Sequence, residues 1–350
     1  MSWVEKTSSG SLRLCERIKV DGSWKRLTVP LEKDTAQARR RATEALEEKK
    51  REMLHPINKR SLKSLMELYM SKKDCRPSTM ANTKRSLMAI YNTIGEIPLE
   101  PSLINQKLLE DPRKPSAVNV NLMPFRAFLR WCFRYGYIPE DIAPRVPNLP
   151  DKTPKKDPDQ KYLEHEELAD ALDQMAGMYL YLSKFLVLSG CRIGEAIALT
   201  MEDLDDDYIH ITKTHSEYGI GEAKTRSSMR DVSIQQNLAE LLEEYKRWRL
   251  LYMVSKGIRT DLLFFSPSGE HIYRNAYDAY LNKIKGPKHI HAHMFRHTHV
   301  ALLAEQGVPL DVISRRLGHE DSRITKDIYF HVTKKLKQRD AEILANVKII

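Results

Sequence analysis

The 350-residue sequence predicts a multidomain, mainly helical protein that carries small β-sheets. Near the N-terminus, apolar residues recur with a spacing of two, which is typical of strands, whereas most of the remaining chain shows helical spacing. A proline-rich segment between residues 144 and 158 interrupts the helical pattern. Because a domain commonly takes about 100 to 200 residues, the chain has room for two or three.

The first part of the chain, residues 1–53, predicts a small sheet followed by one helix. Apolar and polar residues alternate between residues 11 and 30, and the Asp-Gly pair at residues 21–22 is typical of a hairpin turn. Asp34 is a suitable N-cap for a helix that is rich in Ala, Glu, Arg and Lys. Strands and one helix together make a minimal module.

The rest of the chain predicts two further domains. Residues 58–145 show helical apolar spacing that indicates a compact four-helix domain. Five prolines between residues 144 and 158, interleaved with lysines, then predict an extended basic linker over residues 146–160. Residues 161–350 predict a mixed α/β, mostly helical domain with a small inserted sheet, whose strands are expected at residues 208–214 and 230–234.

Charge is distributed unevenly along the sequence. Residues 1–150 carry 28 basic and 17 acidic side chains, whereas residues 151–350 carry 29 and 30. The N-terminal part therefore predicts an acidic partner such as a nucleic acid.

Several classes of protein are excluded by the composition. No run approaches 18 apolar residues, and residues 1–12 lack the apolar stretch of a signal peptide, so we expect a cytoplasmic protein without a membrane span. The four cysteines lie nearly sixty residues apart, a spacing that fits neither a cysteine metal site nor a disulfide framework. Reduced thiols are expected.

The first candidate for chemistry is the segment Ser189-Gly-Cys-Arg-Ile-Gly-Glu195. Its Arg192 and Glu195 are three residues apart and share one helical face. Taken alone, such a pair is most often a surface ion pair. Here the apolar neighbours predict a partly buried Arg192 that Glu195 orients, and a fixed guanidinium is well suited to a phosphate.

The second candidate is a histidine cluster between residues 291 and 299. His293 and His297 have the spacing of a zinc helix, but Met294 stands where that motif needs Glu. Arg296 lies between the two histidines, and its permanent charge favours an anion over a metal cation. No metal site is predicted. The following histidines are interpreted as surface residues: His289, His297 and His299.

The third candidate is the segment from Leu317 to Tyr329, which contains His319 and a tyrosine ten residues later. The chain has 15 tyrosines, and any one of them is more commonly a packing residue than a nucleophile. Only its neighbours in the sequence favour a chemical role for Tyr329.

These segments together resemble the catalytic domain of the tyrosine recombinases, the phage integrase family. The resemblance rests on the SGxRxGE setting of Arg192, HxxRHT at residues 293–298, LGH at residues 317–319 and TxxxYxH at residues 325–331. Four ordered motifs within about 140 residues are a highly specific signal. The family also needs a lysine on a β-hairpin between the first two motifs, and Lys224, in a KTxxSxR pattern, matches it.

The resemblance implies a complete set of roles. It assigns six catalytic residues and one supporting residue, Glu195: Arg192, Lys224, His293, Arg296, His319 and Tyr329. The tyrosine would attack a phosphodiester, and two arginines and His319 would hold its oxygens. His293 would take the tyrosine proton and Lys224 would protonate the leaving 5′ oxygen. The resulting 3′-phosphotyrosine would conserve bond energy, so neither a cofactor nor a metal is expected.

The resemblance also covers the N-terminal part of the chain. Residues 1–53 resemble the arm-binding module of integrases of temperate phages and conjugative elements, and residues 58–145 resemble the family's core-binding domain. The expected function is site-specific recombination that integrates and excises a phage or mobile element. The implied partners are double-stranded DNA with core and arm attachment sites, a homotetramer on synapsed DNA, and an excisionase or host DNA-bending protein.

Three alternatives remain, of which the first is itself a recombinase and the other two belong to other classes. A chromosome-dimer resolvase would normally lack residues 1–53. A type IB topoisomerase-like enzyme would relax supercoils without pairing two sites, and the separate N-terminal module argues against it. A non-catalytic DNA-binding protein should have lost a catalytic group, yet all are present. The sequence leaves open the attachment sites and whether the element is a phage or a conjugative transposon.

Overall fold

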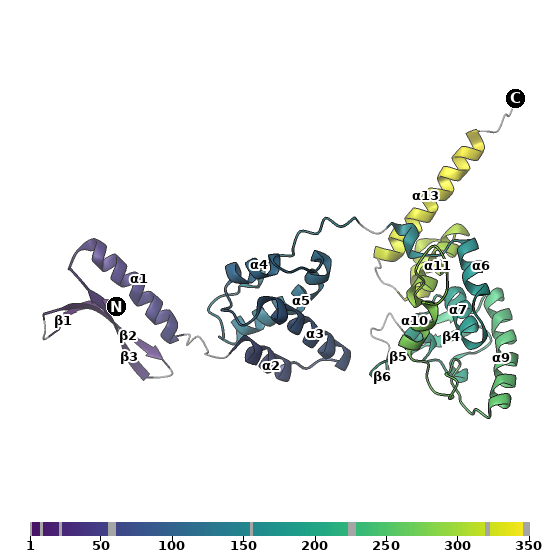
Figure 1. The fold of residues 1–350 in the computed structure, drawn as a ribbon, viewed down its shortest axis with the longest axis horizontal. Coiled ribbons are helices and arrows are strands. Elements are labelled where there is room, and N and C mark those ends of the chain that lie inside the picture. Colours follow the sequence, from purple (N-terminus) through teal and green to yellow (C-terminus); the bar gives the residue numbers. More distant parts are fainter. Residues whose placement is uncertain are drawn as a thin grey trace. The chain divides into compact units, whose positions relative to one another are not determined.

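The chain forms two compact units, Met1–Thr153 and Pro154–Ile350, and each is described by itself. The structure is a computed structural model (Figure 1). It describes residues 2–7, 10–20, 23–54, 61–154, 157–222, 229–318 and 323–345. None of the described helices is both long enough and apolar enough to cross a membrane.

The N-terminal module is a three-stranded antiparallel sheet with one helix on it (Figure 1). Its elements are β1 (Ser2–Lys6), β2 (Leu12–Val20), β3 (Ser23–Leu31) and α1 (Ala36–Leu54). Leu14, Leu27 and Leu46 are buried between sheet and helix. The edge strand β1 was not predicted, because the adjacent apolar Trp3 and Val4 break the alternation, and its register comes from pairing with β2.

Four helices follow, which confirms the prediction for this part of the chain. They are α2 (Leu62–Lys72), α3 (Pro77–Ile94), α4 (Pro101–Leu109) and α5 (Pro115–Arg134). A proline begins each of the last three helices, where its missing N–H costs no hydrogen bond and its fixed φ suits the first turn. The core of this bundle is made of fully buried apolar side chains, among them Ile90, Leu122, Phe125 and Phe128.

Contrary to the expectation from the sequence, the proline-rich segment of residues 144–158 is not extended at either of its ends. Short 3₁₀ helices form at η1 (Ala143–Arg145) and η2 (Pro158–Lys161), because proline is as well suited to begin a tight helical turn as to extend a chain. Val146 is fully buried in the helical core. The Asn119 amide exchanges two hydrogen bonds with the Leu149 backbone, so the chain stays packed on the bundle up to that point.

The second unit is mostly helical, as predicted, but it contains two small two-stranded sheets where one was expected. Its helices are α6 (His165–Asp173), α7 (Gly177–Ser189), α8 (Ile193–Ala196), η3 (Met201–Asp203), α9 (Gln236–Lys256), α10 (Arg274–Leu281), α11 (Ala292–Glu305), α12 (Leu310–Leu317) and α13 (Arg323–Ala345). Its strands are β4 (Tyr208–Ile211), β5 (Lys213–Ser216), β6 (Gly219–Glu222) and β7 (Arg230–Ser233). The single strand expected at residues 208–214 is divided between β4, which pairs with β7, and β5, which pairs with β6.

Helix α11 is central in this unit and packs against α7 on one side and α13 on another. Its Phe295 joins the larger core with α7, whereas its Val300 joins a second core with Leu317 of α12 and Ile328 of α13. Each fully buried side chain of this size contributes about 1.5–3 kcal/mol. The segments with the recombinase-like motifs therefore belong to one packed body.

Candidate active site

The turn that leads into Arg192 depends on a glycine. Helix α7 ends at Gly190, whose φ of 69° lies in the left-handed region that favours glycine. An added Cβ there would lie 2.5 Å from Cδ2 of His299, so a larger residue would also clash. The chain therefore reverses tightly after α7, and Arg192 follows as the N-cap of α8.

Glu195 orients Arg192, as their spacing predicts. The Arg192 Nη1 donates to Glu195 Oε1 at 2.6 Å, and the Arg192 backbone N–H donates to Oε2 at 2.8 Å. The Arg192 side chain remains 33% exposed, whereas Glu195 is buried. Glu195 thus fixes one side of the guanidinium, and the other side remains accessible to solvent.

A second arginine, Arg230, binds the same carboxylate. Its Nη1 and Nη2 lie 3.1 Å and 2.9 Å from the two oxygens of Glu195. Burial raises the pKa of Glu195, but the hydrogen bonds from Arg230 and the nearby arginine charges outweigh burial and lower it to about 2. The sequence analysis did not assign Arg230 to the site, although it is the last residue of the KTxxSxR pattern.

Arg296 is the most deeply placed cation of the site, at 1% exposure. Its Nη1 donates to the Gly190 carbonyl at 2.6 Å, and its Nη2 donates to the Leu317 carbonyl at 2.7 Å. Burial and the Arg192 charge lower its pKa to about 9, so it remains a cation at neutral pH. Arg296 therefore ties the turn before Arg192 to the end of α12.

His293 lies half-buried on α11, one turn before Arg296. Burial, together with the charges of Arg296 and Arg192, lowers its pKa to about 4. Its imidazole is neutral at pH 7 and has a nitrogen able to accept a proton.

The prediction that His299 lies at the surface was wrong. It is 2% exposed, and burial lowers its pKa to about 3. Its Nε2 accepts a hydrogen bond from Arg316 Nε at 3.2 Å, so its Nδ1 carries the proton that is donated to the Val187 carbonyl at 2.7 Å. His297 is half-buried, and His289 is exposed. The helix looked polar in sequence, but neighbouring helices cover more than one of its faces.

Tyr329 lies on α13 and is half-buried against the core that α11, α12 and α13 share. Among the described residues, no hydrogen bond joins its hydroxyl to Arg192 or Arg296. The structure thus brings Arg192, Glu195, His293 and Arg296 together and places Tyr329 on an adjacent helix. Two further predicted site residues, Lys224 and His319, lie outside the described residues.

The helix that carries Tyr329 is held by a carboxylate from the start of the unit. Asp159 Oδ1 accepts hydrogen bonds from His331 Nε2 at 2.9 Å, from Lys335 Nζ at 2.7 Å and from Tyr162 at 2.9 Å. Burial raises the pKa of Asp159, but these bonds prevail and lower it to about 2. Asp159 and His331 are of the residue types that bind metals, but the positive charge of the Lys335 ammonium beside them disfavours a metal cation.

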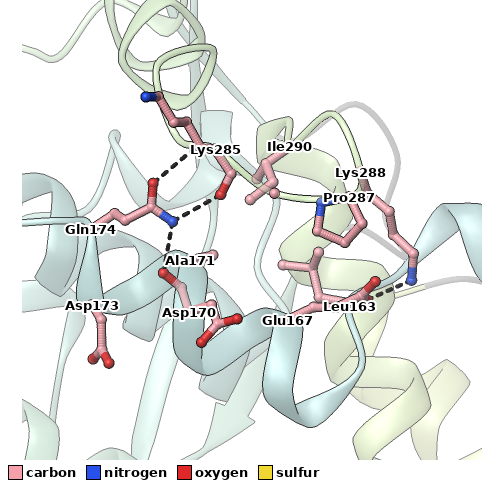
Figure 2. A pocket seen from close by; sticks show the side chains of 11 residues that line it. Leu163, Glu167, Asp170, Ala171, Asp173, Gln174, Lys285, Pro287, Lys288 and Ile290 are labelled. Atoms are coloured by element: carbon pink, nitrogen blue, oxygen red, sulfur yellow. Dashed lines mark hydrogen bonds and ion pairs between the residues drawn. The ribbon is translucent and has the colours of Figure 1, made fainter.

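A cavity of about 270 Å³ lies between α6 and the segment that leads into α11 (Figure 2). The Gln174 amide donates to the Lys285 carbonyl at 2.8 Å and accepts from its N–H at 2.9 Å, while Lys288 pairs with Glu167 at 2.5 Å. None of the described residues that line this cavity belongs to the predicted site. These contacts anchor the segment before α11 and do not form an active site.

The described site is a cluster of cations around a buried carboxylate, with a neutral imidazole beside it. Arg192 is the cation that remains open to solvent, and a guanidinium in that setting binds oxyanions such as phosphate through two N–H groups. A mostly helical domain with such a cluster is suited to an enzyme that acts on phosphodiesters.

Comparison with known proteins identifies the family. Residues 161–335, half of the chain, match the family described as "Phage integrase family". The chain belongs to the phage integrase family and is a site-specific tyrosine recombinase of the integrase type. The fold class and function predicted from the sequence are thereby confirmed.

Two relatives show how far the similarity extends. The prophage ps2 probable integrase of Lactococcus lactis is 29% identical over an alignment of 384 residue positions. This alignment covers 98% of this chain and 99% of that protein. The ICEBs1 integrase of Bacillus subtilis is 34% identical over 172 residues, which cover 46% of each chain.

Two solved structures share the fold. A Tn1549 transposon integrase in complex with transposon right end DNA has a TM-score of 0.63 and 18% identity, covering 81% of this chain and all of that one. A lambda integrase dimer bound to a core site has a TM-score of 0.62 and 15% identity, covering 93% of this chain and 94% of that one. The second alignment spans most of this chain, including both of its units.

Proposed function

We propose that this recombinase cleaves DNA with Tyr329, forms a 3′-phosphotyrosine and thereby integrates and excises a phage or other mobile element. The observation that carries the proposal is the cluster of Arg192, Arg296 and neutral His293 in one packed body with the helix of Tyr329. These groups are the ones that attack on a phosphodiester requires.

The arginines stabilise the charge that develops during attack. As the tyrosine oxygen approaches phosphorus, negative charge grows on the two non-bridging oxygens. Arg192 and Arg296 are held in place before DNA binds, so they need little reorganisation to stabilise this charge. His319 is the third proposed donor to the phosphate.

Proton transfer completes the reaction. A tyrosine hydroxyl, with an ordinary pKa of about 10, is a poor nucleophile at neutral pH. His293 accepts its proton, and the charge of a bound phosphate offsets the nearby arginines and raises the pKa of His293. The bond from phosphorus to the 5′ oxygen breaks as the bond to Tyr329 forms, and Lys224 protonates the leaving oxygen. Attack by a 5′ hydroxyl reverses these steps and rejoins the DNA.

Glu195 orients Arg192 and takes no part in proton transfer. Its pKa of about 2 keeps it ionised at neutral pH, and both of its oxygens already accept hydrogen bonds from arginines. It is therefore a supporting residue in this mechanism.

Trapping the covalent intermediate tests the proposal. The intact protein, incubated in excess EDTA with a nicked suicide substrate from the element's ends, should form a protein–DNA complex that survives denaturation. Trypsin should leave the DNA remnant on the peptide of residues 327–334, whose one tyrosine is Tyr329. A remnant on another peptide contradicts the assignment, and cleavage that only zinc restores would favour metal chemistry.

The N-terminal module is the proposed arm-binding domain. The face of its sheet opposite α1 carries the exposed side chains of Arg13, Arg17, Lys19, Trp24 and Arg26. These alternate along β2 and β3 with the side chains that are buried under the helix. A basic face with an exposed tryptophan offers cations to phosphates and an aromatic ring to the groove. Residues 58–145 are the proposed core-binding domain, with residues 146–160 as the linker and residues 161–350 as the catalytic domain.

Arm binding should depend on that face. The double substitution Arg17→Ala/Lys19→Ala removes two cations that would neutralise DNA phosphates and release the counterions bound to them. The slope of log affinity for arm DNA against log salt should therefore fall by about 2. Cleavage of core-site DNA should be unchanged. Filter binding across a salt series measures the slope.

The matched control is Arg40→Ala/Arg41→Ala, which removes the same charge from exposed positions on α1. It should retain the arm-DNA slope. If both double variants lose equal affinity, only net charge matters, and the arm-binding role of the open face is rejected.

The proposed assembly is a homotetramer on two synapsed sites. A lambda integrase tetramer bound to a Holliday junction is among the proteins that share this fold, with a TM-score of 0.62. An excisionase or a host DNA-bending protein is proposed as the accessory partner that sets the direction of recombination.

A further inference from the structure

The side chain of Arg230 connects the segment of Arg192 and Glu195 to the end of α12. Arg230 begins β7, and its side chain is 7% exposed. A buried charge is costly unless it is paired and hydrogen-bonded, so the partners of this guanidinium are informative.

The first partner is Glu195. Arg230 binds it with two parallel hydrogen bonds of 3.1 Å and 2.9 Å, one to each oxygen. The same two oxygens accept the side chain and the backbone N–H of Arg192. The carboxylate is therefore shared, and the position of Arg192 depends on how Arg230 holds Glu195.

The second partner is the end of α12. Arg230 Nε donates to the Arg316 carbonyl at 2.8 Å, and Arg296 Nη2 donates to the next carbonyl, that of Leu317. The last carbonyls of a helix carry partial negative charge and lack partners within the helix, so two cations are well placed there. Gly318 ends α12, and His319 is the next residue in the sequence.

The third connection is along the chain. Arg230 lies six residues after Lys224 in the sequence, and it pairs with Ile211 across the sheet of β4 and β7. Its anchoring therefore fixes the start of β7, the strand that follows Lys224 in the sequence.

We infer that Arg230 is a positioning residue for strand transfer, which holds Arg192 through Glu195 and holds the end of α12 that leads to His319. It acts through these groups and makes no contact with the phosphate. The inference rests on the proposed function, in which Arg192 and His319 bind the scissile phosphate.

Two substitutions test the role. Arg230→Lys keeps the charge but loses the planar pair of donors, and Arg230→Met removes the charge at similar length. Both variants should keep the thermal melting transition and the affinity for core-site DNA. Their single-turnover rate of covalent complex formation should fall by about 10- to 100-fold, because small displacements of a catalytic group have effects of this size.

Arg249→Lys is the matched control. Arg249 is also a buried arginine, but it donates to the carbonyls of Thr260 and Leu262 in the loop after α9. This variant should cleave at the rate of the intact protein. If cleavage were sensitive to any change at a buried arginine, Arg249→Lys would cleave as slowly as Arg230→Lys.

Coupling to Glu195 separates positioning from a merely structural role. Because Arg230 acts largely through Glu195, the double variant Arg230→Lys/Glu195→Gln should cleave within about threefold of the slower single variant. If the loss of cleavage rate in the double variant equals the product of the two single losses, the two residues act independently and the inference is overturned.

The other outcomes are also decisive. If folded Arg230→Lys and Arg230→Met cleave as fast as Arg249→Lys, the inference is wrong, while inactivity of Arg192→Ala would leave the proposed function intact. If both Arg230 variants lose the melting transition, Arg230 is needed for folding and the positioning role is rejected. Normal cleavage by Arg192→Ala would instead refute the part of the proposed function in which Arg192 binds the phosphate.

Discussion

Replacement of Tyr329 by phenylalanine should abolish the covalent protein–DNA complex and leave core-site binding unchanged. The substitution removes one hydroxyl from a half-buried ring that packs against the core of α11, α12 and α13, so the apolar contacts remain. Without the hydroxyl there is no nucleophile to attack phosphorus, and the phosphate clamp alone forms no covalent bond. The measurement is denaturing electrophoresis with the nicked suicide substrate, beside a binding assay at the same salt.

The control for this substitution is Tyr208→Phe, which removes a hydroxyl from an exposed tyrosine at the start of β4. It should form the covalent complex at the normal rate. A covalent band from Tyr329→Phe would show that another residue attacks the phosphate, and the assignment of α13 as the nucleophile helix would be withdrawn.

The parts of the site that could be predicted from the sequence are those whose members lie close along the chain. Arg192 and Glu195 are three residues apart, so their ion pair follows from helical spacing. Arg230 reaches Glu195 from 35 positions away, and His299 reaches the Val187 carbonyl from 112 positions away. Only tertiary packing brings such groups together, and no local pattern in the sequence indicates these contacts.

The same distinction explains the fold. The four helices between residues 62 and 134 were predicted because amphipathic spacing is a local signal. The edge strand β1 was missed because its pairing with β2, and not its own pattern, makes it a strand. The prolines at residues 144 and 158 favour an extended chain in the sequence pattern, yet their fixed φ equally suits the 3₁₀ turns that form there.

The described site has more arginine cations than carboxylates. Arg192, Arg230 and Arg296 lie around the buried Glu195, and burial together with the repulsion between these cations lowers the pKa of Arg296 to about 9. Burial is also the main reason why the pKa of His293 is lowered to about 4, and the charges of Arg296 and Arg192 add to it. In the proposed reaction, the phosphodiester supplies negative charge beside these cations, so its binding relieves the repulsion and raises the pKa of His293, the proposed proton acceptor.

Replacement of Arg192 by alanine should lower the rate of cleavage by about 10²- to 10³-fold, the size of effect seen when one donor to a developing oxyanion is removed. The fold should tolerate this change. The side chain is 33% exposed, and the buried Glu195 keeps its two hydrogen bonds from Arg230, so no unpaired charge is left in the core.

The measurement is the single-turnover rate of covalent complex formation at saturating DNA, together with thermal melting. Arg192→Lys should fall between alanine and the intact protein, because an ammonium keeps the charge but cannot bind two oxygens at once. Arg259→Ala, which removes the same charge from the exposed loop after α9, should cleave normally. If Arg192→Ala cleaves within a few-fold of Arg259→Ala, Arg192 is only the structural partner of Glu195, and the phosphate must be held by other groups.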